Sequence, residues 1–316
     1  MPLDKALELI LTQAREAGIP DLADLPPPAA RGLYRQILAA NDVSPAAVVV
    51  SENIATGTNG SAPVRVYRPR HGAPIGVIAY YHGGGYVLGD LDGYDNVCRQ
   101  LCFDSQATVV SVDYRLAPEH PFPAAVDDAW AALEWVAANV ATLADEQAPV
   151  AVAGDSAGAV LATVVCLLAR DRRGPAIAYQ GLAYPAAGAG YFGDSDSRSR
   201  YADGPTLTMR TVDYFNRCYF GSTNPPASEL AAPLLAKDCS GLPPALLQVA
   251  THDPLRDEAI AYGTRLREAG NDVVVIEYHG LAHGFISMGG AVPAARLAQL
   301  QLGQALHTAF ATSRAS

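Results

Sequence analysis

Cysteine is scarce in this chain, and its pattern excludes a disulfide framework. The 316 residues include an odd number of cysteines, five, and no two of them form a C-x-x-C pair. Disulfide-stapled folds and zinc sites need paired, closely spaced cysteines. We therefore expect buried, reduced thiols, no metal site and a reducing compartment, the cytoplasm.

Basic runs and long apolar windows are also missing. The chain has 22 Lys and Arg residues against 32 Asp and Glu, a net charge of −10, and it lacks the basic, aromatic-rich tracts typical of nucleic-acid-binding proteins. No stretch approaches the roughly eighteen apolar residues of a membrane span. Charged residues interrupt the first ten positions, so we expect no signal peptide. These features predict neither a nucleic-acid partner nor a membrane span.

The apolar residues that are present predict one large α/β domain. They make up half of the chain, enough for a sizeable core. Short apolar runs alternate with segments of helical periodicity, which favours a mostly parallel sheet with helices on both faces. Strands are expected at about 48–50, 64–67, 76–81, 107–112, 150–153, 177–184, 245–250 and 273–278.

Two segments stand outside this alternation. Residues 3–14 and 33–38 show helical spacing on either side of a proline-rich break at 26–28, before the first strand. Such helices either cover one end of the core or form a cap over a site, and their spacing leaves both open. Residues 186–226 form a long irregular segment with scattered aromatic residues, which is typical of a functional loop.

The segment 150–158, VAVAGDSAG, carries the strongest local signal. A strand-like run ends in G-x-S-x-G and continues into a helical pattern. Gly154 and Gly158 permit a sharp turn that exposes Ser156, and the helix N-terminus favours negative charge beside it. We expect the neighbouring Asp155 to stabilise the turn.

Other polar residues follow strands in the same way. Asp253 and His283 each come after a predicted strand, and the carboxyl ends of parallel strands share one edge of the sheet, where ligands bind. The order Ser…Asp…His is that of the α/β-hydrolase triad. We therefore predict Ser156 as nucleophile, His283 as general base and Asp253 as the acid that orients the imidazole.

The glycine run in 82–86, HGGGY, also follows a buried strand. Three successive glycines lose much backbone entropy on folding, so we favour a backbone that approaches a ligand over a plain surface turn. We expect Gly83, Gly84 and Ala157 to donate their N–H groups to the oxyanion of a tetrahedral intermediate.

Several nearby residues compete for these roles. The competing bases and acids are His82, His252, His279, Asp257 and Glu258. Chain order and loop position favour His283 and Asp253 over them. In the proline-rich loop 113–123, we expect Arg115 and Glu119 to pair with each other and hold the loop.

Five ordered motifs resemble those of the bacterial hormone-sensitive-lipase-like esterases. They are HGGG at 82–85, DYRLAPEH at 113–120, GDSAG at 154–158, DPLRDE at 253–258 and HGF at 283–285. The resemblance implies an α/β-hydrolase fold and cofactor-free hydrolysis of small carboxylic esters with short to medium acyl chains. It also implies a helical cap, made of residues 1–45 and an insertion at 186–226, on a catalytic domain spanning 46–316.

Departures from the family's motifs and two alternative functions accompany this resemblance. Ala159 and Val160 stand where the family usually has Gly-Asn, which narrows one wall of the site. A related hydrolase of amides or formamides would use the same triad. A non-catalytic ligand-binding receptor shares the fold, but such receptors can lack the histidine that is present here as His283. A homodimer is compatible with the sequence, although no residue requires it.

Overall fold

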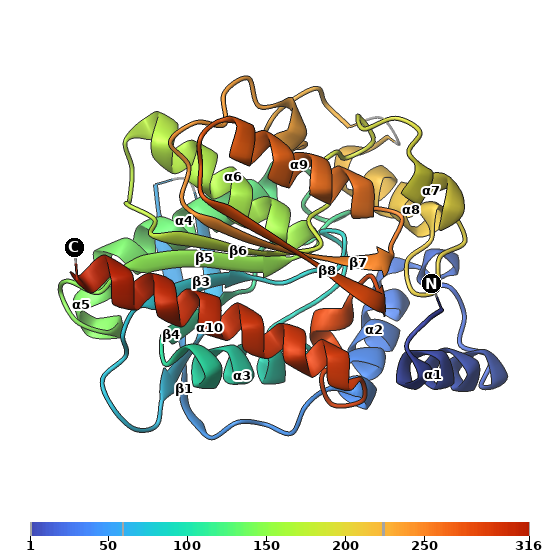
Figure 1. Ribbon diagram of the computed structural model, residues 1–316, viewed down its shortest axis with the longest axis horizontal. Helices are drawn as coiled ribbons and strands as arrows, with labels where there is room; N and C mark the ends of the chain where they lie inside the picture. The colour runs from blue at the N-terminus through green and yellow to red at the C-terminus, as the bar shows by residue number, and fades with distance from the viewer. Residues whose placement is uncertain (1, 59, 223–224, 316) are drawn as a thin grey trace.

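The centre of the molecule is one twisted sheet with the strand order β1-β2-β4-β3-β5-β6-β7-β8 (Figure 1). The computed structural model describes residues 2–58, 60–222 and 225–315. The strands are β1 (Val48–Gly57), β2 (Gly60–Pro69), β3 (Val77–Tyr81), β4 (Thr108–Val112), β5 (Val150–Asp155), β6 (Tyr179–Ala183), β7 (Ala245–His252) and β8 (Val273–Ala282). The pairs β1–β2 and β2–β4 are antiparallel and the others are parallel. This confirms the predicted sheet.

Helices cover both faces of the sheet. They are α1 (Lys5–Glu16), α2 (Pro27–Asn41), α3 (Asp95–Ser105), α4 (Ala124–Ala138), α5 (Val140–Leu143), α6 (Ala157–Arg172), α7 (Asp196–Arg200), α8 (Met209–Phe220), α9 (Arg256–Glu268) and α10 (Pro293–Ala315). Helices α4, α6 and α9 pack on one face, and α3 and α10 pack on the other. In the described part of the chain, no helix has the length and apolar character that a membrane crossing needs.

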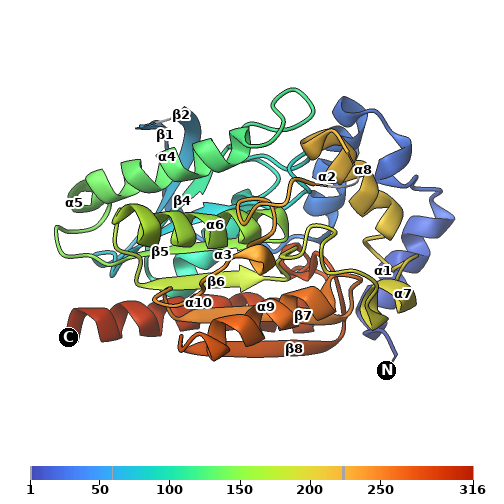
Figure 2. The ribbon, with the colours of Figure 1, turned by 90° about the horizontal axis from the view of Figure 1, so that it is seen from above.

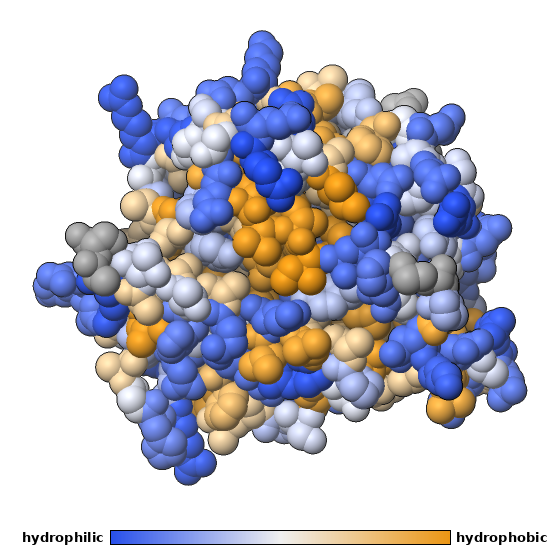
Figure 3. Space-filling view, viewed as in Figure 1, coloured by the Kyte–Doolittle hydropathy of each residue, from blue (hydrophilic) through white to orange (hydrophobic). Residues whose placement is uncertain are grey.

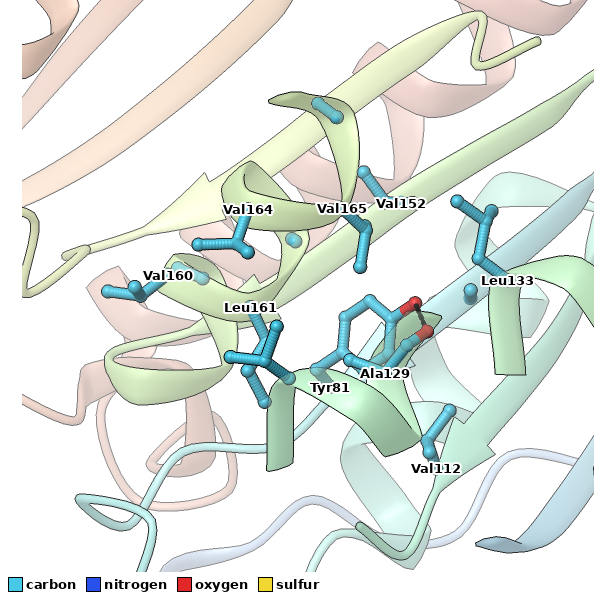
Figure 4. Packing of buried hydrophobic residues seen from close by; sticks show 14 of the residues in the cluster. Tyr81, Val112, Ala129, Leu133, Val152, Val160, Leu161, Val164 and Val165 are labelled. Atoms are coloured by element: carbon cyan, nitrogen blue, oxygen red, sulfur yellow. Dashed lines mark hydrogen bonds between the residues drawn. The ribbon is translucent and has the colours of Figure 1, made fainter. Parts of the chain in front are cut away.

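Strand β3 shows how the two faces are built. Its side chains alternate, as strand geometry requires: Val77, Ala79 and Tyr81 join the core under α4 and α6, whereas Ile78 and Tyr80 join the core under α3 and α10. In Figure 4 the ring of Tyr81 lies among aliphatic side chains, and its hydroxyl donates to the carbonyl of Ala129 at 2.9 Å. Buried on both faces, β3 carries the glycine loop from a rigid base.

The sequence suggested that the proline-rich stretch 26–28 is a break between two helices. In the structure this stretch begins the second helix instead. Helix α2 begins at Pro27. Proline is well suited to the first helical turn, because the N–H that it lacks would have no partner there. The second N-terminal helix is therefore longer than predicted and starts within the proline-rich stretch.

The two segments outside the alternation pack against each other. Figure 2 shows α1 and α2 beside α7 and α8, at the end of the sheet toward which β6 points. Thr211 of α8 donates to Asp21 at 3.1 Å, Tyr214 donates to the carbonyl of Leu25, and Arg210 pairs with Asp24. Residues 223 and 224 of the second segment lie outside the described residues. The contacts of Thr211, Tyr214 and Arg210 join the N-terminal segment, at residues 21–25, to the 186–222 segment.

The cysteine thiols are free, and four of them are buried. Cys98, Cys102, Cys166 and Cys239 lie in the interior, and Cys218 is half-buried. The expectation of buried, unpaired thiols holds for these four.

Candidate active site

Ser156 occupies a strained turn between β5 and α6. Its φ and ψ angles are 52° and −118°, a conformation that non-glycine residues rarely adopt and that is typical of functional turns. The turn needs small neighbours, because a Cβ on Gly158 would lie 1.9 Å from the carbonyl oxygen of Tyr81. The N–H of Ser156 donates to the carbonyl of Ala183 at 2.9 Å. The backbone thus holds the serine at the carboxyl edge of the sheet.

His283 lies between Ser156 and Asp253. Its Nε2 is 2.8 Å from the Oγ of Ser156, and its Nδ1 is 2.7 Å from Oδ2 of Asp253. Asp253 is fully buried, and His283 is 8% exposed. Since a carboxylate only accepts, Nδ1 carries the proton and Nε2 accepts the serine hydroxyl. The structure therefore brings together all three residues predicted for the triad.

Neighbouring groups hold the acid and the base in place. Oδ1 of Asp253 accepts the N–H of Leu255 at 2.8 Å. The carbonyl of His283 accepts the hydroxyl of Thr206 at 2.8 Å, a contact from the 186–226 segment. The Tyr184 ring lies 4.6 Å from the imidazole, centroid to centroid. Thr206 had no signal in the sequence, because the segment that carries it shows no periodicity.

The competing residues have other partners. Asp257 accepts the N–H of Ser197 at 2.9 Å, and Glu258 pairs with Arg198 at 2.6 Å. The His252 ring lies edge-on to Tyr201. Asp257 and Glu258 therefore anchor α7 on α9, in the part of the molecule that the structure describes.

Gly83 does not fit the role predicted for it. Its N–H donates to Oδ1 of Asp155 at 2.8 Å, so it is committed to a buried carboxylate. Within the described residues, the N–H groups of Gly84, Gly85 and Ala157 have no hydrogen-bond partner. This contact contradicts the role predicted for Gly83, and spacing could not reveal it because it does not show which peptide group turns inward.

Asp155 has more partners than the sequence predicted, from which we expected it only to stabilise the serine turn. It is 3% exposed and accepts four hydrogen bonds: from Tyr80 and Gly83 at Oδ1, at 2.9 and 2.8 Å, and from Tyr94 and Tyr184 at Oδ2, at 3.1 and 3.3 Å. Burial raises the pKa of Asp155, and the donors from Tyr80, Tyr94 and Gly83 oppose that rise. It therefore joins the serine turn to the glycine loop.

Arg115 and Glu119 do not pair with each other, contrary to expectation. Arg115 donates bidentate hydrogen bonds to the buried carboxylate of Asp128, the shortest 2.8 Å. Glu119 accepts instead from Arg31 of helix α2, with oxygens 2.6 and 2.9 Å away. Both partners are distant in sequence, so local spacing could not reveal them.

Comparisons with known proteins agree with this geometry. Residues 78–287 match the family described as alpha/beta hydrolase fold. The chain belongs to the α/β-hydrolase family. Within it, the resemblance to the hormone-sensitive-lipase-like esterases is confirmed by its relatives. No group of three or more side chains suited to a metal ion occurs among the residues that the structure describes.

Three relatives of this α/β-hydrolase are representative. Esterase LipI of Mycobacterium tuberculosis is 44% identical over 76% of this chain and 75% of its own length. Ethyl acetate hydrolase of Pseudomonas putida is 36% identical over 76% of each chain. The solved structure of a hyperthermophilic esterase from Pyrobaculum calidifontis is 40% identical, with a TM-score of 0.90 over 98% of this chain and 99% of its own.

Proposed function

We propose that this α/β-hydrolase is a serine carboxylesterase that acts through an acyl-enzyme. The observation that carries the proposal is the His283 imidazole, held within hydrogen-bond distance of both Ser156 and Asp253. A serine hydroxyl is a weak nucleophile at neutral pH, and an adjacent base removes that limitation. Relatives named as esterases and carboxylesterases support the substrate class over amides or a binding-only role.

Acylation uses the three residues in sequence. The Oγ of Ser156 attacks the ester carbonyl carbon while Nε2 of His283 takes the hydroxyl proton. Asp253 stabilises the imidazolium that results. The tetrahedral intermediate then collapses, the bond to the alcohol oxygen breaks, and His283 returns the proton to the departing alcohol. The acyl group remains on Ser156 as an ester.

Deacylation repeats these steps with water. His283 accepts a proton from the water as its oxygen attacks the acyl carbon, and it returns that proton to the Oγ of Ser156 as the acid leaves. In both halves the oxyanion needs N–H donors. We assign Gly84, Gly85 and Ala157 to this role, because their N–H groups are the ones left unpartnered in the described structure.

The substrates we propose are esters of short to medium acyl chains. The Phe215 ring of α8 lies directly against Gly85, where an added Cβ would come within 2.2 Å of the ring. Tyr219, one turn further along α8, stacks on Tyr86 at 3.9 Å between centroids. These rings restrict the space above the glycine loop. The relative named ethyl acetate hydrolase also supports short acyl groups.

Replacing Ser156 tests the proposal most directly. Ser156→Ala should reduce turnover of p-nitrophenyl esters by about 10⁴-fold or more and abolish labelling by a fluorophosphonate, with an unchanged circular dichroism spectrum. A panel of acyl lengths from C2 to C16, assayed beside matching anilides, locates the optimum. Retained esterase turnover in the variant, or a preference for the anilides, would overturn the assignment.

Three further features of the proposed enzyme concern its surroundings. We expect no cofactor, so dialysis against EDTA should leave turnover unchanged. We propose a cytoplasmic location, which the free thiols support. We also propose a homodimer formed at the open edge of β8, where Val274 is 50% exposed. Figure 3 shows apolar side chains gathered on the face of the molecule that bears this strand.

A further inference from the structure

A chain of hydrogen bonds joins helix α2 to the glycine loop. The Tyr34 hydroxyl lies 2.9 Å from that of Tyr94, which donates to Oδ2 of Asp155 at 3.1 Å. Because Tyr94 gives its proton to the carboxylate, Tyr34 is the donor between the two hydroxyls. Oδ1 of the same carboxylate accepts the N–H of Gly83 at 2.8 Å. Four groups thus link the N-terminal segment to the first glycine of the run.

Helix α2 also holds the far end of this loop. Arg31, three residues before Tyr34, donates from Nε to the carbonyl of Val87 at 2.8 Å. The same guanidinium donates to the carbonyl of Ala117 at 2.9 Å. One helical turn of α2 therefore fixes the stretch 83–87 at both ends. The donors assigned to the oxyanion, Gly84 and Gly85, lie between these two anchors.

The geometry points to Tyr34 as a positioning residue for the oxyanion loop. Through Tyr94 and Asp155, its hydroxyl holds the Gly83 peptide and so directs the next two N–H groups toward the reacting carbonyl. Oxyanion donors act over a narrow range, about 2.7–3.1 Å, and losing one costs about 10²–10³ in rate. The docking of α2 thereby sets turnover as well as access. This inference rests on the proposed esterase function.

The direction of these hydrogen bonds, from donor to acceptor, explains why a tyrosine is suited to position 34. Asp155 is buried with neutral donors around it, so its orientation depends on those hydrogen bonds. In a buried network each hydrogen bond strengthens its neighbours. Without the Tyr34 hydroxyl, the Tyr94 oxygen loses the donor that polarises it, and the carboxylate is held less firmly at Oδ2. A phenylalanine ring would preserve the packing and remove only this effect.

Tyr34→Phe is the test, and Tyr81→Phe is its matched control. The Tyr81 hydroxyl also donates a buried hydrogen bond, to the carbonyl of Ala129 (Figure 4), and within the described part of the chain it makes no hydrogen bond with Asp155. Rates are expressed per serine labelled by a fluorophosphonate, which removes unfolded molecules from the count. We expect Tyr34→Phe to lower kcat about tenfold and to slow labelling similarly, with KM within about twofold. Tyr81→Phe should change neither rate by more than about twofold.

A double variant tests the route. In a Tyr94→Phe background the relay is already broken, so adding Tyr34→Phe should lower kcat by less than about twofold. An undiminished effect there, or a Tyr34→Phe variant equal to Tyr81→Phe, would overturn the inference while leaving the esterase assignment intact. A wild-type protein without esterase turnover would instead overturn the proposed function.

Discussion

The imidazole of His82 is buried directly behind the glycine loop. It stacks on Tyr114 at 4.3 Å between centroids, and its Nδ1 lies 2.8 Å from the carbonyl oxygen of Gly83. Its Nε2 has no partner among the described residues. Burial lowers the pKa of His82 to about 4, so the ring is neutral near pH 7. Its hydrogen bond to Gly83 and its stacking on Tyr114 give it a role in ordering the loop, whereas the imidazole that contacts Ser156 is that of His283.

This depressed pKa makes stability depend on pH. Between about pH 6.5 and pH 4 the unfolded chain binds a proton at His82 and the folded chain does not, so the free energy of unfolding rises with pH through that window. The shift of about 2.5 pKa units corresponds to about 3 kcal/mol lost by pH 4. Urea unfolding of wild type and His82→Asn at pH 7, 5.5 and 4.5 measures it. The stability difference between the two proteins should narrow as pH falls, and a constant difference contradicts the prediction.

At the residue scale, the sequence predicted groups whose position follows from local structure. Ser156, Asp253 and His283 each immediately follow the last residue of a strand, and parallel strands bring those ends together. The partner of Gly83 could not be predicted in this way, since Asp155 lies 72 residues further along the chain. Contacts between loops depend on the tertiary packing, which spacing does not encode.

At the scale of elements, helix α8 packs directly against the glycine loop through Phe215 and Tyr219. Its N-terminus is capped by Thr208, whose hydroxyl accepts the N–H of Thr211 at 3.0 Å. The aromatic residues Phe215 and Tyr219 face the loop, and Phe220 packs against Phe122. This helix, Met209–Phe220, lies within the segment 186–226, which the sequence predicted to be irregular.

Truncating Phe215 should therefore change substrate preference. Phe215→Ala removes the ring that lies on Gly85 and opens space above the loop, so kcat/KM for a C8 ester should rise relative to a C2 ester by about tenfold. Phe220→Ala, on the same helix but against Phe122, is the control and should leave the ratio unchanged. Equal shifts in both variants would mean that the helix as a whole, and not this ring, limits the acyl group.

At the scale of the whole molecule, the two edges of the sheet differ in kind. Strand β1 belongs to an antiparallel hairpin that extends away from the site, whereas β8 closes the parallel part of the sheet. Both edges expose apolar residues: Ile54 is 59% exposed on β1, and Val274 is 50% exposed on β8. An unpaired strand edge is a template for pairing with another chain.

A charged substitution at each edge tests where the proposed homodimer forms. Wild type should sediment at twice the mass of one chain, and Val274→Lys should sediment as a monomer, because a buried lysine without a partner opposes association. Ile54→Lys places the same charge on the other edge and should remain dimeric. A monomeric wild type would contradict the dimer, and dissociation by Ile54→Lys alone would place the interface at β1.

The order of strands and helices could be predicted along most of the chain, because alternating apolar runs report the sheet directly. The start of α2 was harder to predict, because Pro27 and Pro28 are compatible with both a break and a helical first turn. Periodicity could not predict how the N-terminal segment and the 186–222 segment pack against each other. Their packing depends on contacts such as Arg210 with Asp24, which join residues nearly two hundred positions apart.

Those contacts have a consequence for building chimeras. Because Asp21, Asp24 and Leu25 hold α8 through three separate partners, the two outer segments form one exchangeable unit. Grafting either segment alone from a relative would leave these contacts unmatched. Transferring both segments together, onto an unchanged sheet, would keep the contacts between them intact. Libraries aimed at new esters are best recombined at the junctions between these two segments and the sheet.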